Sequence, residues 1–95
     1  MTVLIIRAHH RFAMRLPVKL RQAQGKPARG LLIEISKGGA RVSNLGASRF
    51  EVGEQVELTT SGGIVLHGLI RWAHDGLAGI CHATPLHAAE LAQLL

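Results

Sequence analysis

Short segments in which apolar and polar residues alternate, separated by glycine-containing turns, constrain the fold of this chain most strongly. In the segment 16–21, Leu16, Val18 and Leu20 are apolar, whereas Lys19 and Arg21 are charged. A period of two is typical of a strand with one buried face. Comparable segments occur at 30–35, 40–42, 54–60, 64–72 and 77–82, and turn residues separate them at 24–27, 36–39, 61–63 and 74–76.

Strands that recur at hairpin spacing predict a mainly all-β fold, a small antiparallel β-barrel or sandwich of about six strands. A parallel α/β pattern is not visible. Near the end of the chain, Thr84 followed by Pro85 is typical of an N-cap and the first turn of a helix. The pattern predicts a short C-terminal helix from about residue 85. The helix would have an apolar stripe formed by Leu86, Ala89, Leu91, Leu94 and Leu95.

The chain divides into an N-terminal arm and a barrel. Residues 1–15 are basic, show no stable period and contain few candidate core residues, so we predict an arm there. Residues 16–95 would form the barrel with its C-terminal helix. Because 95 residues are too few to build two cores, the barrel is expected to be the only domain.

Charge is distributed unevenly along the chain. Residues 1–50 contain ten lysines and arginines and a single acid, Glu34, whereas residues 51–95 contain one arginine and five acids. A basic half in a small domain favours an anionic partner such as a nucleic acid, a nucleotide, phosphate or an acidic surface.

Cysteine content and hydropathy exclude several classes of protein. A single cysteine, Cys81, excludes an internal disulfide framework and a four-cysteine zinc site, and suits a reducing cytoplasm. The longest strictly aliphatic run, Val3 to Ile6, is far shorter than a membrane span. We therefore expect a cytoplasmic protein without a membrane segment.

Metal binding and catalysis are not favoured by the spacing of the polar residues. The chain has six histidines, and those at His9-His10, His67, His74 and Cys81-His82 lack the close spacing of a structural zinc motif, so no metal and no cofactor is expected. Ser36, His74 and Asp75 contain the groups of a hydrolase triad, but no nucleophile elbow surrounds the serine. The chain is predicted not to be an enzyme.

Trp72 is expected in the core.

Two motifs carry polar residues in patterns that a barrel does not need. The first is Arg11-Phe-Ala-Met-Arg15, and the second is Glu34-Ile-Ser-Lys-Gly-Gly39. Together they resemble the PilZ domain, whose signatures are Arg-x-x-x-Arg and, about twenty residues on, Asp/Asn-x-Ser-x-x-Gly. The segments 53–58, 66–72 and 76–80 look like that family's later strands, so the resemblance covers roughly residues 10–95 and implies a PilZ-type β-barrel.

The resemblance implies binding of cyclic di-GMP, a bacterial second messenger with two guanines and two phosphates in a macrocycle. Arg11 and Arg15 each supply a planar fork of donors that suits phosphate oxygens or the O6/N7 edge of guanine. By the same resemblance, Ser36 offers its hydroxyl and Gly39 keeps the turn open to the ligand. Glu34 stands where the family has Asp or Asn, and it sets the carboxylate about one methylene further out.

Neighbours of these motifs are further candidates for contact with cyclic di-GMP: His10, Phe12 and Lys37. The predicted mechanism is that of a receptor in which the arm closes over a ligand seated against residues 34–39. Residues 7–15 would be unpaired without ligand and ordered with it, and the output would be a partner effector protein.

Two other functions stay open from the sequence. A small barrel that binds RNA or single-stranded DNA through its basic half is one, although three aromatic residues offer few stacking platforms. A ligand-free PilZ-like adaptor that binds only protein is the other.

Overall fold

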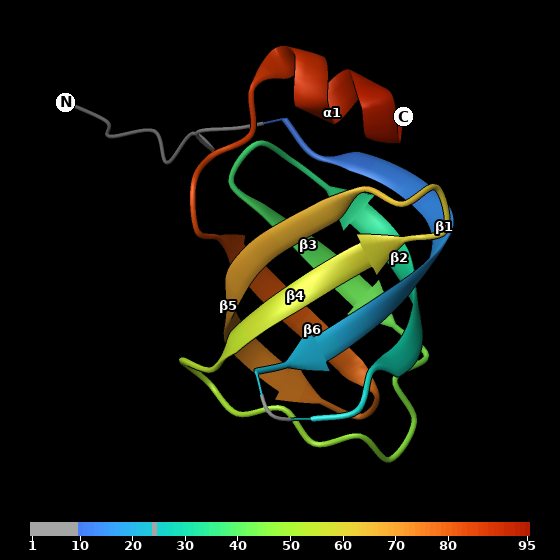
Figure 1. The fold of residues 1–95 in the computed structure, drawn as a ribbon, viewed down its shortest axis with the longest axis vertical. Coiled ribbons are helices and arrows are strands. Elements are labelled where there is room, and N and C mark those ends of the chain that lie inside the picture. Colours follow the sequence, from blue (N-terminus) through green and yellow to red (C-terminus); the bar gives the residue numbers. More distant parts are fainter. Residues whose placement is uncertain (1–9, 24) are drawn as a thin grey trace, which may run out of the picture.

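The computed structural model describes residues 10–23 and 25–95, in which six antiparallel strands close into a barrel with one short helix (Figure 1). The elements are β1 (Phe12–Gln22), β2 (Ala28–Ile35), β3 (Gly39–Ser43), β4 (Gln55–Thr60), β5 (Val65–His74), β6 (Leu77–His82) and α1 (Ala88–Leu94). Around the barrel the order is β1-β2-β3-β6-β5-β4, and β4 pairs with β1 to close it. The predicted fold class is confirmed.

The interior is filled by the apolar residues that alternate along the strands. Leu20, Leu32, Ile35, Ile70 and Val42 are the largest fully buried side chains. Helix α1 lies across one end of the barrel, and the long β3–β4 loop lies at the other end (Figure 1). Leu86, Leu91 and Leu94 belong to the same core cluster as the strand residues, so the C-terminal segment closes its end of the barrel.

Strand β1 begins at Phe12 and not at Leu16, so the predicted boundary between arm and barrel is too late. Phe12 and Met14 are half-buried against the core, while Ala13 and Arg15 are exposed. The alternation therefore extends back through the second half of the arm, where basic side chains on the outer positions obscure it. Residues 1–9 of the predicted arm, including His9 and the run from Val3 to Ile6, lie outside the described residues.

The C-terminal helix is shorter than predicted, and its N-cap is His87 in place of Thr84. The backbone N–H of Leu86 donates to the carbonyl of Lys37 (2.8 Å), which keeps the preceding segment extended across the barrel end. Glu90 then accepts a hydrogen bond from the His87 backbone N–H (2.9 Å) and satisfies the start of the helix. Of the predicted stripe, Ala89 and Leu95 are exposed. Among the described residues no helix is long and apolar enough to cross a membrane.

Three irregularities interrupt the strand pairing. The register shifts between Ala13 and Leu16 in β1, between Leu32 and Glu34 in β2, and between Ile70 and Trp72 in β5. At each shift one strand has one more residue than its partner, which locally bends the strand and redirects its side chains. The shifts in β2 and β5 lie next to residues that line the pocket described below.

Candidate functional site

A row of paired residues crosses the outer face of five adjacent strands. Ala13 of β1 pairs with Glu34 of β2, Glu34 pairs with Arg41 of β3, Arg41 pairs with Gly79 of β6, and Gly79 pairs with Trp72 of β5. Directly paired residues lie about 4.5–5.5 Å apart on one face of a sheet. Charged and aromatic groups far apart in the sequence therefore meet on one surface.

The part of this row from β2 to β5 lines a half-open pocket of about 380 Å³. Four residues of the predicted site line it: Arg11, Glu34, Ser36 and Gly39. Arg41, Arg71 and Trp72 also line it, and the sequence did not single them out as site residues. Three arginines and one glutamate line the pocket, so its net charge favours an anionic ligand.

Arg11 is held at the rim of the pocket by an ion pair. Its Nη1 lies 3.3 Å from Oε1 of Glu34, and the two side chains are 40% and 29% exposed. A pair with this exposure contributes little to folding. Its effect is to orient the Arg11 guanidinium over the second strand.

Trp72 lies outside the barrel core, and the expectation that it is buried is wrong. Ile70 pairs with Ile80 and Trp72 with Gly79, so Arg71 is the extra residue of a bulge. Because of the bulge, Arg71 and Trp72 are both on the outer side of β5.

The indole of Trp72 rests on the backbone of β6. A Cβ atom at Gly79 would overlap Nε1 of the indole, so only glycine leaves room for the ring there. The guanidinium of Arg41 lies 5.5 Å from the centre of the ring, within range of a cation–π contact, and the ring of His74 stacks 5.2 Å away. These contacts fix a half-buried aromatic face in a cationic pocket.

The turn between β2 and β3 is closed by its own serine. The Ser36 hydroxyl accepts hydrogen bonds from the backbone N–H groups of Gly38 (3.2 Å) and Gly39 (3.1 Å). The backbone N–H of Ser36 donates to the carbonyl of Gly39 (2.9 Å). The hydroxyl therefore shapes the pocket wall by holding the turn.

Gly39 is required by packing, and its φ angle is not positive. The glycines with positive φ in the described chain are Gly46, Gly53, Gly63 and Gly76. A Cβ atom at Gly39 would lie 2.5 Å from the carbonyl oxygen of Ile80. The absence of a side chain lets β3 approach β6 closely beside the pocket.

His82 connects the turn to β6 from inside the barrel. Its Nε2 lies 3.1 Å from the carbonyl oxygen of Ser36, and its side chain is buried. A carbonyl only accepts, so the imidazole donates from Nε2. Burial lowers the pKa of His82, and backbone hydrogen bonds with Ser36 and Gly39 and the charge of Glu90 oppose that shift in part. The neutral imidazole is therefore the favoured form.

The remaining predicted site residues lie elsewhere. Arg15 is exposed in β1, two positions beyond the row, and does not line the pocket. His10, Phe12 and Lys37 line a different pocket, which they share with Leu91 and other residues of the C-terminal segment.

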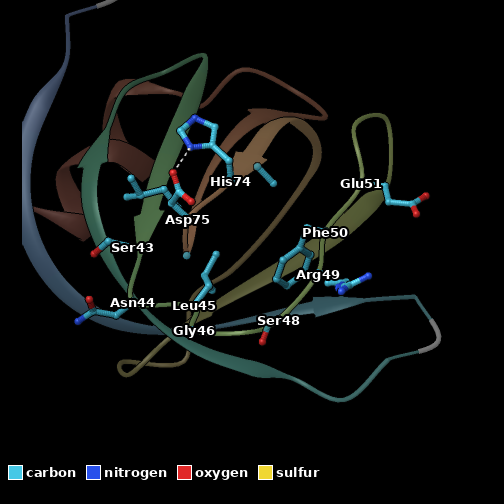
Figure 2. A pocket seen from close by; sticks show the side chains of 13 residues that line it. Ser43, Asn44, Leu45, Gly46, Ser48, Arg49, Phe50, Glu51, His74 and Asp75 are labelled. Carbon is cyan, nitrogen blue, oxygen red and sulfur yellow. Dashed lines mark ion pairs between the residues drawn. The ribbon is translucent and has the colours of Figure 1, made fainter.

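A further pocket of about 650 Å³ lies between the β3–β4 loop and the β5–β6 turn (Figure 2). His74 and Asp75 stand on one side of it, with Nδ1 of the histidine 3.5 Å from Oδ2 of the aspartate. Ser36 lines the other pocket. The three groups of a hydrolase triad are therefore not assembled. Within the described part of the chain, no three His, Cys, Asp or Glu side chains are arranged to hold a metal ion.

Comparison with known proteins identifies the family. The family model of the PilZ domain matches residues 5–95. A search of the curated proteins gives no match. Several solved structures share the fold, among them the following two. The PilZ domain of CeSA from a cellulose synthesizing bacterium is 22% identical with a TM-score of 0.71, over 90% of this chain and 91% of that one.

The second is the Bacillus subtilis inhibitor of motility (MotI/DgrA), which is 18% identical with a TM-score of 0.71, over 94% of this chain and 48% of that one. The chain thus spans about half the length of MotI/DgrA. The barrel order, the two motifs and a family match over nearly the whole length agree, and we conclude that this chain belongs to the PilZ domain family.

Proposed function

We propose that the protein is a non-enzymatic receptor for cyclic di-GMP that binds the dinucleotide in the pocket on its outer face. PilZ domains are a family of cyclic di-GMP effector domains. The observation that carries the proposal is the combination of Arg11, Arg41 and Arg71 with the half-exposed ring of Trp72 in one pocket.

Each of these groups matches a part of the ligand. Guanidinium forks bind phosphate oxygens or the O6/N7 edge of guanine with two hydrogen bonds. The face of Trp72 offers a platform on which a purine stacks. Glu34 is an acceptor for the N–H groups of a guanine, and it also orients Arg11. The excess of positive groups complements the two phosphates.

Arg15 enters the proposal as the second arginine of the motif. Arg11, which directly precedes β1, and Ala13 and Arg15 at the start of β1 are all exposed, in alternation with half-buried residues. Four residues of strand span about 13 Å, so a ligand that contacts both arginines lies along the strand. Ser36 and Gly39 supply the adjoining wall.

The proposed signal is a change in the surface offered to a partner protein. The prediction that residues 7–15 are unpaired without ligand is wrong for Phe12 and Ala13, which pair with Ile35 and Glu34 of β2. The change that we propose within the described chain therefore concerns exposed side chains around the pocket, above all Arg11 and Arg15. A ligand shifts such an equilibrium only by its differential affinity for the two arrangements.

Isothermal titration calorimetry with cyclic di-GMP tests the proposal, with GTP and a short RNA as comparison ligands. We expect the wild-type chain to bind cyclic di-GMP and the variants Arg11→Ala and Arg41→Ala to bind it roughly 10- to 100-fold more weakly, since each loses a charge-assisted contact of about 1.5–3 kcal/mol. Arg15→Ala is the parallel test of the second arginine.

Arg29→Ala is the matched control, because Arg29 is exposed on β2, the strand that carries Glu34, but does not line the pocket. It is expected to bind like the wild type. RNA binding without a response to cyclic di-GMP would replace this proposal with the nucleic-acid function. Binding of neither ligand would leave the protein-binding adaptor.

A further inference from the structure

Two buried polar side chains stand out among the described residues, and only one of them adjoins the pocket. Thr60 is 5% exposed and His82 is 6% exposed. Thr60 Oγ1 accepts a hydrogen bond from the Ile64 backbone N–H (3.1 Å) and so closes the β4–β5 hairpin locally. His82 reaches across 46 positions of sequence to the carbonyl of Ser36.

One short segment satisfies three successive carbonyls of the β2–β3 turn. The Ser36 carbonyl accepts from His82 Nε2 (3.1 Å), and the Gly38 carbonyl accepts from the backbone N–H of His82 (3.0 Å). The Lys37 carbonyl accepts from the backbone N–H of Leu86. The Gly39 carbonyl accepts from the backbone N–H of Ser36. Every carbonyl of the turn is thus engaged.

Three N–H groups of the turn, those of Ser36, Gly38 and Gly39, are engaged as well. Those of Gly38 and Gly39 donate to the Ser36 hydroxyl. A turn whose backbone groups are satisfied internally loses little freedom when a ligand settles against it, and this preorganisation lowers the cost of binding. Segment 82–86 makes three hydrogen bonds to the carbonyls of the turn, and among these only the one from the His82 imidazole comes from a side chain.

We propose that His82 is a positioning residue for the cyclic di-GMP pocket: its imidazole Nε2–H holds the Ser36 carbonyl, and through it the 36–39 wall, in the conformation that receives the ligand. The identity of the ligand rests on the proposed function, whereas the effect of His82 on the turn does not. The ligand does not need to touch His82, because the imidazole lies behind the wall inside the barrel.

Substitutions at His82 test this in the full chain. His82→Leu removes the donor, and His82→Gln places an amide N–H at a similar reach. Thr60→Val is the matched control, because it removes a buried hydrogen bond at a different turn. Two quantities are measured: amide hydrogen exchange of Gly38 and Gly39 without ligand, and affinity for cyclic di-GMP at a temperature where each variant is folded.

We expect His82→Leu to exchange the Gly38 and Gly39 amides at least tenfold faster than the wild type and to bind cyclic di-GMP about tenfold more weakly. His82→Gln is expected to recover most of both effects. Thr60→Val is expected to leave both unchanged, even where its thermal stability falls as far as that of His82→Leu. If His82→Leu does not fold, His82→Asn replaces it, because its shorter amide does not reach Ser36.

If the amides of Gly38 and Gly39 exchange at the wild-type rate in His82→Leu, or in His82→Asn where that variant replaces it, the positioning role is refuted. An equal loss of affinity in Thr60→Val would also overturn it, since His82 would then act only through global stability. Failure of the wild-type chain to bind cyclic di-GMP would instead refute the proposed function, and the exchange rates would still decide whether His82 holds the turn.

Discussion

Glu34 shows how one methylene alters the site at the scale of a single residue. The family pattern has Asp or Asn at this position, and the longer glutamate side chain lies 3.3 Å from the guanidinium of Arg11. An ion pair this exposed contributes about 0–1 kcal/mol to stability. Its consequence for the site is that Arg11 is already directed toward the pocket before a ligand arrives.

Substitution of Glu34 by alanine is expected to change the affinity in opposite directions for the two leading functions, cyclic di-GMP binding and RNA binding. We expect Glu34→Ala to weaken cyclic di-GMP binding by about 1–3 kcal/mol, because the guanine loses an acceptor. Glu34→Asp keeps the carboxylate and is expected to bind equally well or more tightly. Calorimetric titration of both variants with cyclic di-GMP and with RNA measures the changes. Tighter RNA binding by Glu34→Ala, without a response to cyclic di-GMP, would contradict the account, since loss of a negative charge favours binding of phosphates.

The sequence predicted the part of the site that consists of local motifs. Arg11, Glu34, Ser36 and Gly39 were singled out, and all four line one pocket. Arg41 and Arg71 resemble other surface arginines in the sequence. They line the pocket only through pairing between strands that are distant in the chain, and a single sequence does not display such pairing.

At the scale of the element, the bulge in β5 decides where Trp72 points. The alternation of Leu66, Gly68 and Ile70 as buried residues predicts that Trp72 continues inward. The extra residue, Arg71, shifts the alternation by one position, so each later side chain of β5 points to the opposite face of the strand. A bulge depends on the partner strand, so it cannot be inferred from the period of one strand. The glycine opposite, Gly79, is the one local sign that a large side chain lies across the outer face.

Gly79→Ala tests the platform formed by these two elements. The added methyl group would displace the indole from β6, so we expect a red-shifted Trp72 emission and a loss of about 1–3 kcal/mol in cyclic di-GMP binding, the value of one base–aromatic stack. Gly62→Ala is the control, because its methyl group would meet only Thr60 Oγ1 at 3.8 Å. Unchanged emission and affinity in Gly79→Ala would show that Trp72 is not the platform.

The ends of elements were harder to predict than their order. All six strands were expected in the observed sequence, because each needs only a few alternating residues and a turn. The start of β1 was missed because Phe12 and Met14 are only partly buried against the core, so the alternation there is weak among basic residues. The start of α1 was missed since the Leu86 N–H is used by Lys37 across the barrel, a contact between distant parts of the chain.

At the scale of the whole molecule, the buried His82 makes stability depend on pH. Burial lowers the pKa of the folded-state imidazole, whereas the unfolded chain takes up a proton at about pH 6.5. Below that pH the unfolded state binds more protons, so the free energy of unfolding falls as the pH falls. His82→Gln lacks this contribution.

Denaturant unfolding of wild type and His82→Gln at pH 7.5 and 5.5 measures the effect. We expect the stability of the wild type relative to the variant to decrease at the lower pH. The other titrating groups are present in both chains and cancel to a first approximation in that difference. An equal difference in unfolding free energy at the two pH values would contradict the buried, neutral state of His82.

Fluorescence titration with cyclic di-GMP tests whether the ligand occupies the proposed pocket, because Trp72 is the only tryptophan and it lines that pocket. We predict a saturable change in Trp72 emission whose midpoint agrees with the calorimetric affinity. The midpoint is expected to rise roughly 10- to 100-fold in Arg11→Ala and to stay in place in Arg29→Ala. Calorimetric binding without any change in Trp72 emission would place the ligand elsewhere, and no response of the wild-type chain in either measurement would contradict the assignment of this protein as a cyclic di-GMP receptor.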